Sequence, residues 1–295
     1  MFALETKSVD SACKKGNQRP TRITILVDNE VRPGLNLIPE HGFAALVERG
    51  PVRILFDTGQ GPALVHNAQL LGIGLSSLSA IVLSHGHNDH TGGLLHAVKS
   101  NPGVRIVAHP AVFSQHLKLP DNGKIYRRIG VPYSRNALEE FGAVFDFVAS
   151  PKEILPGFWF TGSVPRVHEI TPDIRLVTVE GNSRIPDPLE DDCSLVTNTA
   201  SGPVLLFGCA HAGVRNILEH VRNKLAIDRV FACIGGTHLG KSPESEINSV
   251  VEAFEQVGVR LLAPAHCTGA RAKSVLESHF GSRFCAARAG DVFEF

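Results

Sequence analysis

The chain has 295 residues, of which 43% are hydrophobic and 28 are glycine, a composition typical of a globular protein with a large core. Lysine plus arginine and aspartate plus glutamate both total 29, so no net charge is available to hold nucleic acid or an anionic membrane. The six cysteines form no C-x-x-C pair and no short secreted framework, which favours a reducing compartment, and we expect a cytoplasmic protein.

The first residues contain no signal for secretion. Residues 1–20 lack an uninterrupted apolar stretch, so we expect a polar N-terminal leader and not a signal peptide. No segment approaches the roughly 20 apolar residues that a membrane span needs. Residues 21–295 are expected to form a single domain.

Short apolar runs separated by turn residues predict strands in the first half of the chain. Helical spacing of apolar residues predicts helices over Pro62–Leu71 and from Leu94 to Lys99. Residues 110–172 are less regular and rich in proline and glycine, which predicts an inserted lid or substrate loop. The strands are expected at Arg22–Asp28, Phe43–Glu48, Val52–Phe56, Ala80–Leu83 and Val104–Ala108.

The second half alternates strands and helices more regularly. The helices are expected at Val214–Lys224 and Pro243–Val257. Hairpins in the first half and strand-helix units in the second predict an α/β protein with two sheets between helical layers. The strands are expected at Asp173–Val179, Ser194–Thr199, Val204–Phe207, Arg229–Ile234 and Arg260–Ala263.

A histidine-rich run directly follows the strand expected at Ala80–Leu83. It places His85, His87, Asp89 and His90 within six positions. His85 and His87 can close on one cation, while Asp89 and His90 point toward a second. Imidazole and carboxylate suit zinc, iron or manganese, so the run predicts a dinuclear metal site; a solvated turn is the alternative.

This run also carries a family resemblance. The order Leu55-Phe56-Asp57-Thr58-Gly59, then His85-x-His87-x-Asp89-His90, resembles the metallo-β-lactamase superfamily over roughly residues 22–295. The chain is most similar to its dihydropteroate-synthase-like branch, related to 7,8-dihydropterin-6-methyl-4-(β-D-ribofuranosyl)aminobenzene 5′-phosphate synthase. The resemblance implies a four-layer αββα sandwich. The later motifs that carry it are 161–166, 191–196, 208–213, 234–239 and 264–269.

The resemblance implies that further ligands come from strand ends in the second half. His211 and His266 both follow expected strands, and an ordinary hydrogen-bonded loop histidine is the alternative for each. Asp57 is expected to support a ligand imidazole, or merely to cap its turn. The first metal is assigned to His85, His87 and His211, and the second to Asp89, His90 and His266.

The chain departs from the superfamily at Gly208-Cys209, where an aspartate that bridges two metals is usual. Cys209 can bind metal as a thiolate, which would favour zinc, or be a small buried residue. Asp192 is a weaker candidate for the missing carboxylate, since paired acids before a strand are also an ordinary turn. We therefore expect one or two divalent ions, with Zn²⁺ first and Mn²⁺ or Fe²⁺ as alternatives.

Other residues are candidates for contact with the substrate. His238 is expected to donate a proton to the leaving group or to bind a phosphate, by analogy with phosphodiesterase members of the superfamily. Arg166 is expected to hold an anion. Lys124, Arg127 and Tyr133 can bind a phosphate and stack a flat ring, or belong to a solvated cationic loop. The remaining histidines receive no role: His41, His66, His96, His109, His116, His168, His220 and His279.

Together these residues predict a metal-dependent hydrolase. Its metal-activated water would attack a small ester, phosphoester or related substrate, and Asp89 would both bind metal and orient the nucleophile. The first alternative is a transferase or synthase that acts on a pterin and a phosphorylated substrate. A diiron redox protein or a non-catalytic metal-binding protein is a further alternative. The expected partner is a small molecule, not nucleic acid or a membrane.

Overall fold

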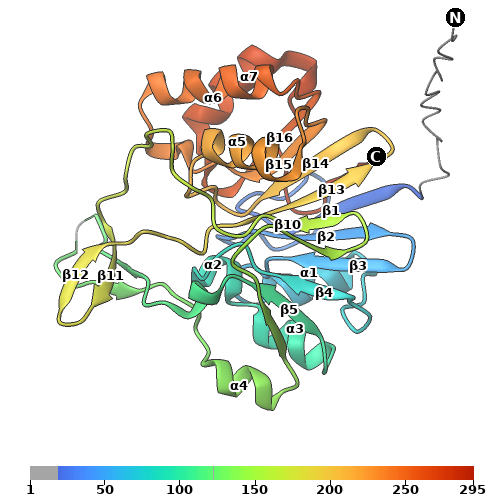
Figure 1. Ribbon diagram of the computed structural model, residues 1–295. Helices are drawn as coiled ribbons and strands as arrows, with labels where there is room; N and C mark the ends of the chain where they lie inside the picture. Colours follow the sequence, from blue (N-terminus) through green and yellow to red (C-terminus); the bar gives the residue numbers. More distant parts are fainter. Residues whose placement is uncertain (1–18, 122) are drawn as a thin grey trace, which may run out of the picture.

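The computed structural model describes residues 19–121 and 123–295, so most of the predicted leader lies outside the described residues. Two large sheets pack face to face, and helices cover the outer face of each (Figure 1). The predicted four-layer αββα sandwich is confirmed. Among the described helices, none is both long and apolar enough to cross a bilayer.

The first sheet has seven strands in the order β17-β1-β2-β3-β4-β5-β8. From β3 to β8 neighbouring strands are parallel, and the others are antiparallel. Helices α1, α3 and α4 pack on its outer face. The strands are β1 (Thr21–Val27), β2 (Ala44–Arg49), β3 (Val52–Phe56), β4 (Ala80–Val82), β5 (Arg105–Ala108), β8 (Val144–Phe147) and β17 (Val292–Glu294). The helices are α1 (Ala63–Leu70), α2 (Asn88–Thr91), α3 (Leu94–Ser100) and α4 (Arg135–Glu140).

The second sheet has six strands in the order β16-β15-β14-β13-β10-β9, with β14, β15 and β16 parallel. Helices α5, α6 and α7 cover its outer face, at the top of Figure 1. The strands are β9 (Lys152–Leu155), β10 (Phe158–Phe160), β13 (Ser194–Thr199), β14 (Gly202–Phe207), β15 (Ala232–Gly236) and β16 (Leu261–Ala265). The helices are α5 (Val214–Leu225), α6 (Glu244–Gln256) and α7 (Ala270–Phe280).

The alternation of side chains along each strand builds this layered core. In β3, Ile54 and Phe56 face the space between the sheets, while Leu55 packs under the helices. In β14, Leu206 faces the other sheet and Leu205 faces the helices. Because both faces of each sheet are buried, these strands appear in the sequence as continuous apolar runs.

The predicted lid at 110–172 is wrong in its extent. Within that range β8 completes the first sheet, and β9 and β10 complete the second. The glycines and prolines there mark tight turns between short strands, as at Gly157 (φ 76°) between β9 and β10. What projects instead is a small sheet, at the left of Figure 1, in the order β12-β11-β6-β7. Its strands are β6 (Leu117–Lys118), β7 (Arg127–Arg128), β11 (Leu176–Glu180) and β12 (Ser183–Pro186).

Topology determines where the predicted ligands meet. The carboxyl ends of parallel neighbours lie at the same edge of a sheet, so the loops after β3 and β4 meet there, as do the loops after β14, β15 and β16. Short 3-10 helices occur in the loops after β15 and β16 and at two places elsewhere in the described chain. They span Pro110–Phe113, Leu239–Lys241, His266–Thr268 and Gly281–Arg283.

Candidate metal centre

Two histidines of the loop after β4 begin the site. His85 is completely buried and His87 nearly so, and His85 Nε2 lies 2.9 Å from His87 Nδ1. Burial lowers the pKa of His87 to about 3, and burial and neighbouring imidazoles hold the pKa of His85 well below its ordinary value. Both rings are therefore neutral, the form in which imidazole binds a metal.

His211 joins this pair from the loop after β14. Its ring centroid lies 4.9 Å from those of both His85 and His87. Within the described part of the chain, His211 Nε2 and His87 Nε2 are buried and have no hydrogen-bond partner. Buried polar atoms without partners cost free energy, so an ion or ligand is expected beside them. The three rings fit a divalent metal.

A second set lies beside the first. Asp89 Oδ2 is 3.3 Å from His266 Nε2 and 4.0 Å from His90 Nε2, and the rings of His90 and His266 lie 5.1 Å apart. Burial alone would lower the pKa of His90, but the carboxylates of Asp57 and Asp89 outweigh it and raise that pKa to about 9. The same carboxylates favour any cation at this position, a proton or a metal ion.

Asp57, at the end of β3, links the two sets. Its Oδ2 accepts hydrogen bonds from the hydroxyl of Ser84 and from His90 Nδ1, both at 2.7 Å. The Ser84 oxygen in turn lies 2.9 Å from His85 Nδ1. These contacts place a ring proton of His85 and of His90 on Nδ1, so that Nε2 of each ring faces the other candidate ligands. Asp57 lines neither cleft described below, and its side chain contacts Ser84 and His90.

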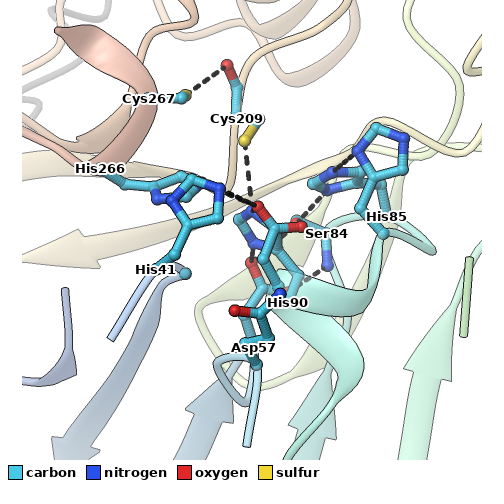
Figure 2. Close-up of polar contacts among 12 residues, drawn as sticks. His41, Asp57, Ser84, His85, His90, Cys209, His266 and Cys267 are labelled. Carbon is cyan, nitrogen blue, oxygen red and sulfur yellow. Dashed lines mark hydrogen bonds and ion pairs between the residues drawn. The ribbon is translucent and has the colours of Figure 1, made fainter. Parts of the chain in front are cut away.

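Cys209 lies between the two sets (Figure 2). Its sulfur is 3.2 Å from His90 Nε2. Ligand atoms of Cys209, His85 and His211 all lie within 4.8 Å of one another, and the same holds for Cys209, His90 and His266. Burial raises the pKa of the Cys209 thiol well above its ordinary value. A positive ion beside the sulfur would reverse that effect.

Two buried acids before β13 fix the histidine loops. Asp191 accepts the backbone N–H of Gly86 at 2.7 Å, and Asp192 accepts that of Ala212 at 2.8 Å. Burial raises the pKa of Asp192 to about 7. Among the described residues, Asp192 joins none of the histidine and cysteine groups close enough to share an ion, so the structure places it under the His211 loop and not between the metal positions.

Two histidines that received no role from the sequence lie at the site. His41 Nε2 is 3.3 Å from Asp89 Oδ2, with the ring more than half exposed. The ring centroid of His116 is 5.1 Å from that of His87, and its Nδ1 lies 2.7 Å from Asp187. Neither histidine belongs to a motif or follows a strand that ends at this edge, so spacing alone gave no signal for them.

The backbone is strained around the site. Of six described non-glycine residues with positive φ, four flank the ligands: Asp57, Ala210, His238 and His266, with φ between 46° and 58°. This conformation costs of order 1–3 kcal/mol per residue and persists where the surroundings impose it, most often at functional sites.

Two clefts open beside the ligands and share Asp173, Leu176, His211 and His238. The first, here called the apolar cleft, has a volume of about 380 Å³. The second, the basic cleft, has about 340 Å³ and contains Lys118, Arg127 and Arg128 with the metal-binding candidates His41, His87, Asp89, Cys209 and His266. Apolar side chains in the first include Ile170, Ile174, Leu189, Val214, Leu239 and Val250.

Of the predicted substrate residues, three line these clefts and two do not. His238 lines both, with its ring centroid 4.2 Å from that of His211. Arg166 lines the apolar cleft and Arg127 the basic cleft, whereas Lys124 is exposed and lines neither. The hydroxyl of Tyr133 donates to the carbonyl of Gly92 at 2.9 Å, so Tyr133 supports the histidine loop from outside both clefts.

Comparison with known proteins agrees with this geometry. Residues 37–266 match the family model described as the metallo-beta-lactamase superfamily. The chain belongs to this superfamily. A solved structure described as a metal-dependent hydrolase of the β-lactamase superfamily is 30% identical, with a TM-score of 0.81 over 93% of this chain and 99% of that one.

Relatives of known sequence extend the match within the superfamily. The chain is 29% identical to 7,8-dihydropterin-6-methyl-4-(β-D-ribofuranosyl)-aminobenzene-5′-phosphate synthase of Methanocaldococcus jannaschii, over 87% of this chain and 90% of that protein. A Zn²⁺-bound PqqB from Methylobacterium extorquens shares the fold, with a TM-score of 0.55 at 13% identity over 93% of this chain and all of that one. The predicted resemblance to the superfamily and to the synthase-related branch is confirmed.

Proposed function

We propose that the protein is a metal-dependent hydrolase that acts on a small ester or phosphoester through a metal-activated water. The single observation that carries this proposal is the meeting of His85, His87 and His211 in a buried cluster beside two clefts, where His87 Nε2 and His211 Nε2 have no hydrogen-bond partner. A purely structural cluster of histidines would satisfy those nitrogens within the protein. Zn²⁺ is the proposed ion because neutral imidazoles dominate the set.

A bound divalent ion supplies a water of lowered pKa and a positive charge for the oxygen anion that develops during hydrolysis. We propose two ion positions. His85, His87 and His211 would hold the first ion, and Asp89, His90 and His266 would hold the second. The Asp89 carboxylate can accept a hydrogen bond from the attacking water and orient it. His238, which lines both clefts, would donate a proton to the leaving group.

The basic cleft supports a substrate with an anionic group. Lys118 and Arg127 are directly opposite each other in the β6–β7 ladder, where like charges destabilise a strand pair. Within the described part of the chain, neither these two residues nor Arg128 has a carboxylate within ion-pair distance. Asp89 and Asp173 also line this cleft, and a phosphate or carboxylate of the substrate would pair directly with the cations.

The test of this anion site measures substrate binding separately from the rate of the chemical step. Replacing both Lys118 and Arg127 by glutamine is expected to raise KM for a phosphorylated substrate about 10-fold or more and to leave kcat nearly unchanged. Arg184→Gln is the matched control, because Arg184 belongs to the same small sheet but stacks on Tyr126 at 4.9 Å. Equal KM values in the double variant and the control would exclude the basic cleft as an anion site.

Hydrolysis itself is tested with His87→Ala and Asp89→Asn. Both variants are expected to lose bound metal or to fall at least about 100-fold in turnover of a metal-dependent phosphodiester, phosphomonoester, thioester or lactone substrate. His96→Ala is the control, since His96 lies in α3 with its side chain outside both clefts. Full metal content and turnover in both variants would refute the assignment.

A synthase that joins a pterin to a phosphorylated substrate is the second candidate, and two observations favour it. The relative from Methanocaldococcus jannaschii is named as a synthase of a dihydropterin-containing phosphate, and the apolar cleft of about 380 Å³ can hold a ring system beside His211. Calorimetry distinguishes the candidates. Tight binding of a dihydropterin diphosphate, with no binding or turnover of simple phosphodiesters, would favour the synthase.

A further inference from the structure

The apolar cleft extends beyond the residues that the proposed chemistry uses. Glu246 and Val250 of α6 line it, and neither lines the basic cleft. The segment 169–174 also lines it, and the chain around this segment runs from the second sheet past α6 to β11 (Figure 1). The cleft therefore has one part beside His211 and His238 and another part beside α6.

A buried carboxylate oxygen in the part beside α6 has no partner. Glu246 Oε1 accepts the backbone N–H of Thr171 at 3.3 Å, whereas Oε2 is buried and has no hydrogen-bond partner among the described residues. Glu246 is the third residue of α6, where a glutamate often accepts the N–H of the residue that caps the helix. The capping residue here is Pro243, which has no N–H. Since an unpartnered buried oxygen costs free energy, a ligand that donates to Glu246 is expected.

His238 marks the part of the cleft nearest the metal-binding candidates. Its Nδ1 is also buried and without a partner in the described part of the chain, and its ring lies beside that of His211. The proposed function places the leaving group of the substrate at this ring. A leaving group that begins at His238 and extends along the apolar cleft would approach Glu246, because both residues line the same cavity of about 380 Å³.

The walls of this cavity are largely apolar. Leu239 and Val250 are buried, but Ile174 is 82% exposed. An isoleucine this exposed gains free energy when an apolar ligand covers it. An aromatic ring system has apolar faces for such walls, and an N–H group at its edge would match the free oxygen of Glu246.

We propose that the apolar cleft binds the leaving group of the substrate, and that this group is an aromatic ring system with an N–H donor for Glu246. The anionic group would lie in the basic cleft, so the substrate class is a phosphoester of an aromatic alcohol that carries an amino or ring N–H group. This inference rests on the proposed function, because it takes the attacked centre to lie at the metal positions.

The test measures binding of non-hydrolysable probes and needs no turnover. Naphthylphosphonate and aminonaphthylphosphonate differ only in an N–H donor, and methylphosphonate lacks the ring. In calorimetry of the full-length, metal-loaded protein, wild type should bind the amino compound about 10-fold more tightly than naphthylphosphonate. Glu246→Met should remove this preference, and Glu246→Gln, whose carbonyl can still accept, should keep part of it. Glu244→Met is the matched control, since Glu244 lies in the same helical turn, is exposed and lines neither cleft.

A second comparison tests the apolar wall. Ile174→Ser should weaken binding of both naphthyl compounds about 3-fold or more and leave methylphosphonate binding unchanged. Ile125→Ser is its control, because Ile125 is 80% exposed and lines neither cleft.

The wild-type comparison decides the proposal even where a variant fails to fold. Equal affinity of wild type for the two naphthyl compounds, or a full preference in folded Glu246→Met, overturns it. The preference in a protein that turns over none of the tested substrates would uphold this binding site while refuting hydrolysis. Turnover of phosphoesters without the preference would do the reverse.

Discussion

The substitution Asp57→Asn tests how one buried carboxylate prepares both metal positions. Asp57 Oδ2 accepts hydrogen bonds from Ser84 and His90, and the Ser84 oxygen in turn accepts a hydrogen bond from His85 Nδ1. An asparagine that keeps its carbonyl on the Ser84 backbone N–H would turn its NH₂ group toward the other two partners. His85 and His90 would then have to accept at Nδ1 and carry their protons on Nε2.

The size of the effect follows from this reversal of ring protons. A ring nitrogen that carries a proton cannot bind a metal. Each set would therefore lose one ligand, or its metal affinity would fall by the free energy needed to move the proton back to Nδ1. Loss of a group that orients a metal ligand typically costs about 10–100-fold in affinity, or about 1.4–2.7 kcal/mol. We expect a loss in this range at both positions of Asp57→Asn, measured by competition with a chromophoric chelator.

Two controls define the mechanism. Ser84→Ala interrupts only the path to His85, so it should weaken one position and spare the other. Asp291→Asn changes a partly buried aspartate that accepts the backbone N–H of Arg288, away from the site, and should leave metal affinity unchanged. If folded Asp57→Asn, verified by circular dichroism, binds both ions as tightly as wild type, the proposed control of ring protons is wrong.

Two further predictions concern stability. Removal of metal with a chelator should lower the free energy of unfolding, because the buried nitrogens of His87 and His211 lose their partner. The loss should be about 4 kcal/mol relative to protein in free metal at about 1,000 times its Kd. An unchanged melting temperature would contradict this prediction. Arg283, with His279, lowers the pKa of Glu255 from 4.5 to about 2, so this carboxylate stabilises the fold above pH 4.5 and loses that effect as pH falls toward 2. Glu255→Gln should therefore cost at most about 1 kcal/mol in urea unfolding at pH 7, since the pair is exposed, and nothing below pH 2. Glu252→Gln, on the same helix and in no ion pair among the described residues, is the control.

Expectations from the sequence were most accurate where side chains are buried on both faces of a sheet. The strands at Val52–Phe56 and Ser194–Thr199 have the predicted bounds, and each contains consecutive buried apolar residues that face opposite sides of the sheet. The strand predicted at Arg229–Ile234 begins later, at Ala232, although Val230 before it is buried in the core. Strand β17 was not predicted, because three residues give little local pattern, and helix α7 was missed although Ala272, Leu276 and Phe280 recur at helical spacing.

The sequence by itself determined which groups can bind metal. The histidine run follows a buried strand, and the order of motifs gave the superfamily, so the six histidine and aspartate candidates could be named before their distances were known. Spacing along the chain is sufficient for this because a strand end fixes where the next few side chains point.

Only the tertiary structure decided what surrounds those groups. His41 and His116 reach the site from segments outside the predicted motifs, and no local pattern distinguishes them from ordinary loop residues. The same holds for the pairing of β6 with β7, which brings Lys118 opposite Arg127. Such contacts depend on how separate strands align and how the sheets pack, which is a property of the whole chain and not of any segment within it.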